Sequence, residues 1–258
     1  MPPDPLSGGN VQHHPVTVVT GGSRGIGAAI STRLAADGHH IAIGYHSDAE
    51  AAEKAAESVR AAGAGGARCV TVRMDTAEET DVDRLFETAA TELGPVTGLV
   101  NNAGIGAPVG PLAEADAAAM RRALDVNVLG YLLCARRAIR DMKRTGAGGG
   151  IVNISSAAAT LGAPGEYVHY AAAKGAVDTI TVGLSKEVAA DGIRVNAVAP
   201  GVIWTEFHAD PERPGKLAAG IPLGRAGDPD EIAAAVAWLL SDEASYATGT
   251  ILRVAGGR

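Results

Sequence analysis

The sequence is short of the residues that mark several classes of protein. Only 3% of its 258 residues are aromatic and only two are cysteines. Cys69 and Cys134 stand far apart and give neither a disulfide framework nor a zinc-binding spacing, so no metal site is expected. No apolar run of about 18 residues occurs, which excludes a membrane-spanning helix. The net charge of −7, with no stripe of Lys and Arg, argues against a nucleic-acid partner.

The composition that remains is typical of a globular protein, with 47% hydrophobic and 20% charged residues. Because aromatic residues are few, Ala, Val, Ile and Leu must fill the core. Residues 1–15 are rich in Pro, Gly, Asn and His and lack the apolar segment of a signal peptide. We therefore expect a disordered leader over 1–15, one domain over 16–258 and a cytoplasmic location.

Short β-branched runs alternate along the chain with longer alanine-rich segments of helical period. The expected strands are 16–20, 41–44, 69–73, 98–101, 151–155, 194–198 and 251–254. The expected helices are 25–37, 48–62, 79–93, 116–144, 167–191 and 228–241. This alternation predicts an α/β fold: a single-domain, Rossmann-type, doubly wound parallel sheet of about seven strands flanked by helices. The segment 199–227, rich in Pro and Gly, is expected to be an irregular functional loop.

A glycine-rich turn joins the first expected strand to the first expected helix, in the stretch Thr20–Gly27 (TGGSRGIG). Glycines permit a tight turn and a close approach of the backbone to a pyrophosphate, and the helix N-terminus adds free N–H groups. The strand–turn–helix context predicts a dinucleotide site, although the spacing TGxxxGxG differs from the more familiar GxGxxG.

The end of the second strand bears on the choice between NAD and NADP. NAD sites usually place a carboxylate there to bind the ribose hydroxyls, but here the strand ends in Tyr45, His46 and Ser47, with no acid before Asp48. Arg24 in the glycine-rich turn can reach the same region. We therefore expect NADP(H), with NAD(H) possible. The alternative is that Arg24 is a solvated charge and that Tyr45 and His46 merely cover the adenine.

Tyr170 and Lys174 stand four residues apart in the stretch YAAAK, a spacing that places both side chains on one helix face. A positive charge beside a phenol lowers the tyrosine pKa, and a tyrosine of lowered pKa exchanges a proton readily with a substrate oxygen. Taken alone, the same spacing also fits an ordinary pair on a helix surface.

Polar residues follow other expected strands at the same edge of the sheet. Asn101–Gly104 (NNAG) follows the fourth strand, Ser155 and Ser156 follow the fifth, and Pro200-Gly201 follows the sixth. Asn127 interrupts an apolar helical run, where a buried amide needs partners. It serves either a helix kink or a catalytic hydrogen bond.

Taken in order, these motifs resemble the classical short-chain dehydrogenase/reductase family, and the resemblance covers the chain from about Val16 to its C-terminus. It implies a catalytic set of Asn127, Ser156, Tyr170 and Lys174, with Tyr170 as acid/base and Lys174 lowering its pKa and binding the nicotinamide ribose. The resemblance also implies that Ser156 holds the substrate oxygen and that Asn127 holds a water that relays protons to Lys174. The cofactor contacts that it implies, together with those expected above, are Gly21, Ser23, Arg24, Ile26, Gly27, Tyr45, His46, Ser47, Asp75, Thr76, Asn101, Ala103, Gly104, Tyr170, Lys174, Pro200, Gly201, Ile203 and Thr205.

One spacing departs from the family pattern, because Ser156 precedes Tyr170 by fourteen residues instead of the common thirteen. Ser155 therefore stays a minor alternative, although strand alternation predicts that only one of the two serines faces the site. Tyr167 is assigned to the substrate pocket or to packing. The pocket lining is expected from 106–111, 157–169 and 202–220.

The expected function is an NADP(H)-dependent oxidoreductase that interconverts a ketone or aldehyde with an alcohol and acts on a small molecule. The alternatives are an NAD-dependent sugar or polyol dehydrogenase of the same family and a catalytically silent nucleotide-sensing regulator. The apolar helices predicted over 116–144 and 167–191 suggest a homotetramer, with a dimer as the alternative.

Overall fold

The computed structural model describes residues 14–63, 66–106, 109–207 and 210–258. Its centre is a seven-stranded sheet in the order β3-β2-β1-β4-β5-β6-β7, in which every pair of neighbours is parallel. The strands are β1 (Val16–Thr20), β2 (His40–Tyr45), β3 (Cys69–Arg73), β4 (Val96–Asn101), β5 (Gly149–Ile154), β6 (Ile193–Pro200) and β7 (Ile251–Val254). The predicted doubly wound fold is thereby confirmed.

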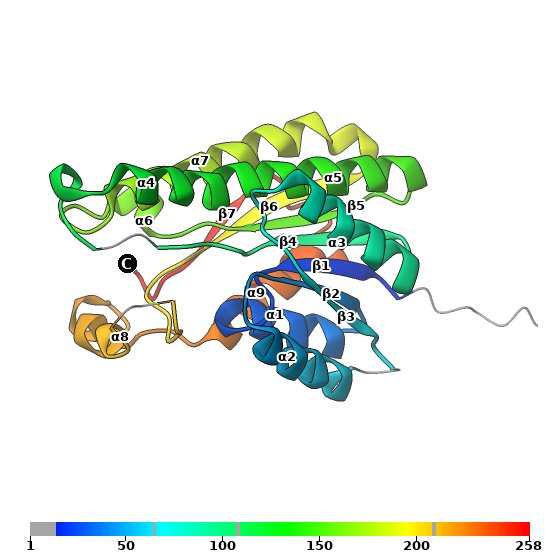
Figure 1. The fold of residues 1–258 in the computed structure, drawn as a ribbon, viewed down its shortest axis with the longest axis horizontal. Helices are drawn as coiled ribbons and strands as arrows, with labels where there is room; N and C mark the ends of the chain where they lie inside the picture. Colours follow the sequence, from blue (N-terminus) through cyan, green and yellow to red (C-terminus); the bar gives the residue numbers. More distant parts are fainter. Residues whose placement is uncertain (1–13, 64–65, 107–108, 208–209) are drawn as a thin grey trace, which may run out of the picture.

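Helices cover both faces of this sheet (Figure 1). On one face α1 (Gly25–Ala36) packs against α2 (Ala49–Ala62) and α9 (Pro229–Leu240). On the other face α3 (Glu79–Glu92) packs against α5 (Gly130–Thr145), and α4 (Ala117–Leu124) packs against α7 (Val168–Glu187). Two short helices, α6 (Ala158–Leu161) and α8 (Arg213–Leu217), lie at the end of the sheet where the strands finish.

The core divides into two layers because alternate residues of each buried strand face opposite sides. Val18 and Leu99 pack with Phe86 under α3 and α5, whereas Val19 and Val100 pack with Ile30 under α1 and α9. Both layers consist mainly of aliphatic residues and alanine. A protein with 3% aromatic residues thus fills its core with many small side chains.

The strand order reverses between β1 and β4, which lie side by side although β2 and β3 separate them in sequence. From β1 the chain winds outward through β2 and β3, and from β4 it winds the other way through β5, β6 and β7. The connections after β1 and β4 therefore leave a crevice between them at the carboxyl edge of the sheet, the usual ligand position in such folds.

Three segments differ from the sequence prediction. The helix predicted over 116–144 is interrupted by a π-helical turn at Asp125–Leu129, which separates α4 from α5. The irregular segment 199–227 contains α8. Most of the predicted leader lies outside the described residues, but His14 bonds through Nδ1 to Gly38 O (2.8 Å) and stacks on His40. His14, which lies within the predicted leader, is therefore held against the connection between α1 and β2 and against the start of β2.

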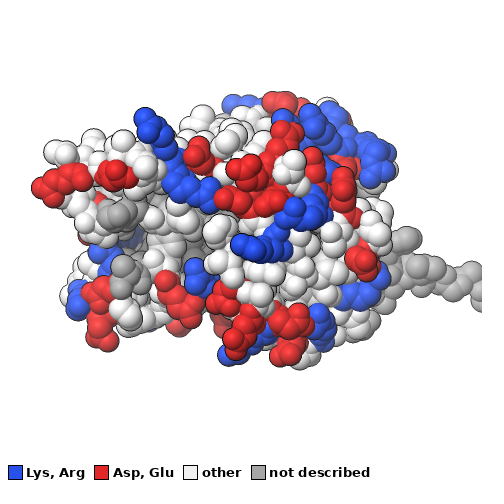
Figure 2. Space-filling view, in the orientation of Figure 1, with Lys and Arg blue, Asp and Glu red and all other residues white. Residues whose placement is uncertain are grey.

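Charged side chains of both signs are interspersed over the face shown in Figure 2. Many charged residues of the described ranges are paired, as Arg137 is with Asp83 and Asp141, and Arg225 with Glu231. Within the described ranges, no helix is long and apolar enough to cross a membrane.

Candidate active site

A cavity of about 480 Å³ opens at the carboxyl edge of the sheet, a volume in the usual range for a small-molecule site. Its walls come from the turns after β1, β2, β3, β4 and β5, from the start of α7 and from the segment between β6 and α8. These are the turns that the sequence motifs occupy. Most of the predicted site residues line it: Gly21, Ser23, Arg24, Ile26, Gly27, Tyr45, His46, Ser47, Asp75, Thr76, Ala103, Gly104, Ser156, Tyr170, Lys174, Pro200, Gly201, Ile203 and Thr205.

The glycine-rich turn after β1 forms the floor of one half of the cavity. Gly21 adopts a φ of +63°, and a Cβ on Gly27 would lie 2.2 Å from Gly21 O, so neither position accepts a larger residue without a rearrangement. In the described part of the chain, the side chain of Arg24 makes no capping hydrogen bond at the start of α1. First-turn N–H groups thus face a narrow glycine cradle, an arrangement that fits the pyrophosphate of a dinucleotide.

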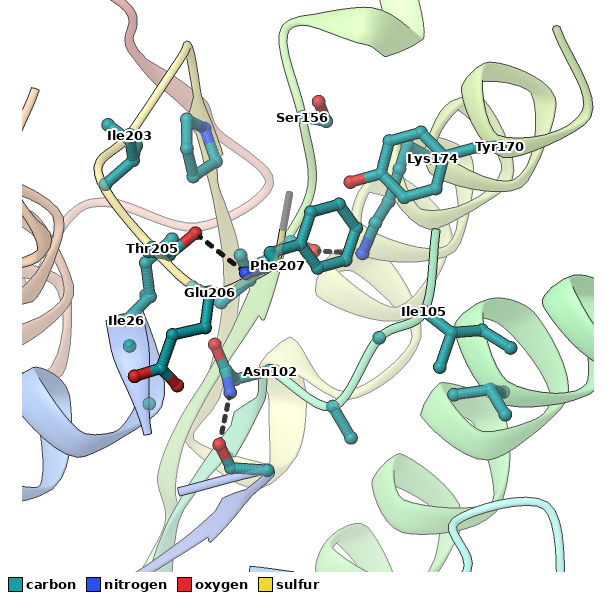
Figure 3. A pocket seen from close by; sticks show the side chains of 18 of the residues that line it. Ile26, Asn102, Ile105, Ser156, Tyr170, Lys174, Ile203, Thr205, Glu206 and Phe207 are labelled. Atoms are coloured by element: carbon teal, nitrogen blue, oxygen red, sulfur yellow. Dashed lines mark hydrogen bonds between the residues drawn. The ribbon is translucent and has the colours of Figure 1, made fainter. Parts of the chain in front are cut away.

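The turns after β1 and β4 are joined by hydrogen bonds. Thr20 Oγ1 accepts from the N–H groups of Asn102 and Ala103, at 3.0 Å each. Asn102 Nδ2 donates to Thr20 O and Gly21 O, at 2.9 Å each, and a bond of the Asn102 amide is drawn in Figure 3. The two turns that border the crevice are therefore held as one unit. The structuring role of Asn102 was missed at the sequence level, although NNAG marked the turn.

Asn101, predicted as a cofactor contact, lies beneath the cavity instead of lining it. Its side chain is 1% exposed and its Nδ2 donates to Asn153 Oδ1 (3.0 Å) and Tyr131 O (3.2 Å). As the last residue of β4, it points into the α5 side of the sheet, because strand residues alternate between faces. The neighbouring Asn102 faces the cavity.

Asp75 lies where the turn after β3 meets the cavity. Its Oδ2 accepts from Arg122 on α4 (2.6 Å) and its Oδ1 accepts from Ala77 N (3.0 Å). Partial burial alone would raise the pKa of Asp75, but the hydrogen bonds from Arg122 and Ala77 outweigh it and lower the pKa. Arg122 is a second wall residue that the sequence analysis did not identify, because no local pattern links α4 to the turn after β3.

Tyr170 and Ser156 meet at the opposite end of the cavity, where α7 begins (Figure 3). Burial raises the pKa of Tyr170 to about 12, and a hydrogen bond with Ser156 opposes the rise. The sequence prediction for Tyr170 was a lowered pKa. It was wrong in direction because it counted the charge of Lys174 and not the desolvation of the phenol. Lys174 Nζ is 5.8 Å from the centre of the Tyr170 ring.

Lys174 is 3% exposed, one turn along α7 from Tyr170. Its Nζ donates to Ile154 O (2.8 Å) and to the hydroxyl of Tyr131 (3.1 Å). Burial lowers its pKa to about 7, while the charge of Asp178 opposes the change. The ammonium is thus poised to exchange a proton near neutral pH.

The two serines after β5 have different partners. Ser155 donates to Asp178 Oδ1 and, at 3.4 Å, to Lys174 O. Ser156 Oγ accepts from Ala158 N (3.1 Å) and lies beside Tyr170. The hydroxyl beside the phenol therefore belongs to Ser156, and the longer Ser–Tyr spacing is accommodated by the turn that contains α6.

Asn127 lies in the π-helical turn and is fully buried. Its Nδ2 donates to Ile105 O and Ala123 O, at 2.9 Å each, and its Oδ1 accepts from Ile105 N (3.2 Å). The amide therefore anchors the turn after β4 to the irregular helix. Its side chain does not line the cavity but borders Gly104, which does.

The remaining wall faces α8. Arg213 on α8 donates to Glu166 Oε2 (2.7 Å) and to Tyr167 OH (3.3 Å), and the Phe207 ring lies 5.9 Å from that of Tyr170. Trp204 is half-exposed between the wall residues Ile203 and Thr205, and its backbone N–H donates to Gly227 O (2.9 Å). The segment after β6 is thus tied both to α7 and to the turn before α9.

Comparison with known proteins agrees with this arrangement. A family model described as enoyl-(acyl carrier protein) reductase matches residues 21–258. The uncharacterized oxidoreductase YgfF of Escherichia coli K12 is 45% identical over 248 residues, covering 94% of this chain and 99% of YgfF. The cis-4-hydroxycyclohexanecarboxylate dehydrogenase of Sinomonas cyclohexanicum is 43% identical over 246 residues, covering 94% and 95% of the two chains.

Two solved structures show the same fold. A short-chain type dehydrogenase/reductase from Mycobacterium marinum superposes with a TM-score of 0.88 at 30% identity and covers 94% of each chain. A blue fluorescent protein from a metagenomic library, crystallised with NADPH, superposes at 0.86 with 39% identity, covering 94% of this chain and 97% of that one. The motifs, the strand order and these relatives agree that the chain belongs to the classical short-chain dehydrogenase/reductase family of NAD(P)-dependent oxidoreductases.

Proposed function

We propose that this protein is an NADP(H)-dependent carbonyl reductase or alcohol dehydrogenase in which Tyr170 is the acid/base. The observation that carries the proposal is that one cavity holds both the glycine cradle and the group of Ser156, Tyr170 and Lys174. The bound nicotinamide would supply or accept the hydride. The chain's own residues would orient the substrate and move the proton.

Ser156 and Tyr170 would bind the substrate oxygen together, since their hydroxyls lie side by side. With its pKa raised to about 12, Tyr170 keeps its proton at neutral pH and suits donation to a carbonyl oxygen. Proton return to Tyr170 would come through Lys174, whose pKa of about 7 allows it to exchange near neutrality. Asn127 would support this path by fixing the turn at Ile105.

The cofactor would lie along the turns after β1 to β4, with its pyrophosphate at Gly21 to Gly27. The preference for NADP(H) is supported by two side chains at the ribose end. Asp48 accepts from Ala51 N (2.9 Å) as the cap of α2, so its carboxylate is already engaged, and Arg24 is exposed at the mouth of the cavity. A cation without a free carboxylate beside it suits a 2′-phosphate.

The substrate would be a small ketone or secondary alcohol held between Tyr170 and α8. Apolar side chains, among them Leu161, Phe207 and Leu217, make up much of this wall, and the Arg213–Glu166 pair gives it one polar end. Relatives include dehydrogenases named for a hydroxycyclohexane carboxylate and a 3β-hydroxysteroid. A cyclic alcohol with a second polar group at a distance from the reacting carbon would fit such a pocket.

The direct test combines cofactor titration with a substrate panel. NADPH and NADH are titrated by fluorescence, and cyclic ketones, sugars and acyl thioesters are then screened at the nicotinamide absorbance. We expect tighter NADPH binding and turnover of cyclic ketones. Tighter NADH binding with sugar oxidation would favour the sugar dehydrogenase alternative, and nucleotide binding without turnover on any class would favour a silent regulator.

We further propose a homotetramer. Leu124, Leu129 and Leu132 are each more than 40% exposed along α4, the π-helical turn and α5, and Val168 is 39% exposed at the start of α7. Apolar side chains in such a row usually meet a partner surface. Light scattering would test the state, with a dimer as the alternative outcome and a monomer as the contradicting one.

A further inference from the structure

The buried ammonium of Lys174 is held by two neutral oxygens. Ile154 O and the Tyr131 hydroxyl accept from it at 2.8 and 3.1 Å, and the aromatic ring of Tyr131 lies 4.8 Å from Nζ. A lysine ammonium has three N–H donors. Two of these donors are therefore bonded to Ile154 O and to the Tyr131 hydroxyl, and one donor remains.

Tyr131 owes its position to α5. It follows Asn127 by four residues, is 1% exposed, and its hydroxyl donates to the same Ile154 O at 3.0 Å. With its own proton committed to that carbonyl, the Tyr131 oxygen can only accept from Lys174. Three atoms, Tyr131 OH, Ile154 O and Lys174 Nζ, thus form a closed triangle behind the cavity.

The open side of this triangle faces the cavity. Lys174 lines it, and a Cβ placed on Gly104 would lie 3.7 Å from Nζ. Gly104 belongs to the turn after β4 that borders the crevice. The third N–H of Lys174 is therefore left for a group in the cavity.

We propose that Tyr131 is a positioning residue for Lys174, holding the ammonium in its charged form and leaving one N–H for the cavity; this rests on the proposed role of Lys174 in the active site. The competing explanation is that Tyr131 is a core residue whose hydroxyl merely bonds to the nearest carbonyl. The two explanations differ in whether the pKa of Lys174 changes when the Tyr131 hydroxyl is removed.

The surroundings of Lys174 explain why a neutral partner is suitable. The titratable and charged groups around it are Tyr131 on α5, Tyr170 and Asp178 on α7 and, beyond Asp178, Arg253 on β7. Asp178 bonds to Ser155 instead of Lys174. A carboxylate in direct contact would fix the proton on Lys174, whereas a phenol hydroxyl stabilises the ammonium without preventing its titration.

The titration of Lys174 can be followed in the cofactor-free protein by NMR of lysines labelled with ¹³C at Cε. The chain has five lysines, and Lys54, Lys143, Lys186 and Lys216 are exposed, so the resonance that titrates near neutral pH and disappears in Lys174→Met identifies the buried one. We expect Tyr131→Phe to lower its midpoint by about one pH unit, since a hydrogen bond to the charged form is lost.

Thr181→Val is the matched control. Thr181 is fully buried on α7, where its hydroxyl donates to Val177 O and accepts from Asn153 Nδ2, with no bond to Lys174. The Thr181→Val substitution removes a buried hydroxyl from the same layer, and the titration midpoint of Lys174 should stay at its wild-type value. Equal midpoints in wild type, Tyr131→Phe and Thr181→Val would overturn the proposal.

A second measurement covers the case in which Tyr131→Phe does not fold. Replacing all tyrosines by 3-fluorotyrosine in the Tyr170→Phe background keeps the shape of residue 131 and makes its oxygen a poorer acceptor. The midpoint of Lys174 should again fall, and an unchanged midpoint would contradict the inference. Because no substrate is needed, a catalytically silent protein would still show the effect, so this result is separable from the proposed function.

Discussion

The two ends of the sheet use cationic side chains in opposite ways. At the amino end, Arg194 on β6 donates to the carbonyls of Leu239, Leu240 and Ser241, and so closes the C-terminus of α9. Arg68 does the same for Glu92 O and Leu93 O after α3. These cations complete helix ends, and arginine suits the task because it stays charged at any physiological pH.

At the carboxyl end the buried cation is a lysine, and burial brings its pKa to about 7. Nearby, the phenol of Tyr170 has its pKa raised to about 12. Burying an ionisable side chain without a partner of opposite charge lowers the free energy of unfolding. It also shifts the pKa of that side chain, which can then exchange a proton during a reaction. The contrast shows that charge at the amino end stabilises the fold, whereas charge at the carboxyl end is held ready for chemistry.

The largest effect should come from removing the phenol hydroxyl at the carboxyl end. Tyr170→Phe is expected to lower kcat for carbonyl reduction by at least about 10²-fold, because the proton donor is lost, while the melting temperature changes little. Tyr167→Phe is the control, since its ring packs edge-on against that of Tyr170 at 5.4 Å between centroids. Steady-state kinetics of both variants would decide, and equal rates would refute the role of Tyr170.

At the amino end the expected loss is in stability. Arg194→Met keeps much of the aliphatic length but leaves the carbonyls at the end of α9 without their donor. We expect the free energy of unfolding to fall by about 2 kcal/mol with kcat unchanged. Denaturant unfolding together with kinetics measures both. A lower kcat without a loss of stability would contradict the assignment of roles to the two ends.

Arg24 tests the ribose end of the carboxyl edge. Arg24→Ala should weaken NADPH binding about tenfold, since one cation facing the 2′-phosphate is lost, and leave NADH binding nearly unchanged. Arg33→Ala is the matched control for surface charge, because Arg33 is an exposed arginine on α1 that is paired with Asp37. An equal loss of affinity for NADPH and NADH would show that Arg24 does not contact a 2′-phosphate.

The carboxyl end should also make stability depend on pH. The pKa of Lys174 is lowered from 10.5 to about 7, so between these values the unfolded chain binds more protons than the folded one, and stability rises with pH. Its slope is at most about 1.4 kcal/mol per pH unit for this one group. Lys174→Met should remove this rise, and Lys143→Met, at an exposed lysine, should retain it. Denaturant midpoints measured from neutral to alkaline pH would show whether each variant keeps the rise in stability.

The architecture was predictable because the strands are short runs rich in β-branched residues and the segments between them are mostly longer stretches of helical period. The strand positions agree with the sequence prediction to within two residues. The site was also largely predictable, since parallel strands bring the turns after each of them to one edge. Ser156, in the turn after β5, meets Tyr170 and Lys174 of α7 at that edge.

What escaped prediction depends on contacts between distant segments. The π-helical turn arises where Asn127 bonds to Ile105, and no local pattern in 116–144 signals it. No local pattern signals the contact of Tyr131 with Lys174 or that of Arg122 with Asp75 either. The pKa of Tyr170 is raised instead of lowered, because the sequence shows that Lys174 is a neighbour but not how deeply the phenol is buried.

The position of Trp204 gives this molecule a built-in optical probe. The chain has two tryptophans, and Trp204 stands between wall residues of the cavity whereas Trp238 is on α9, on the α1 side of the sheet. Indole emission overlaps the absorption of a reduced nicotinamide, so binding would quench the first tryptophan more than the second. Trp238→Phe would then leave a single emitter at the mouth of the site, and ligand arrival at the segment after β6 could be timed without any label.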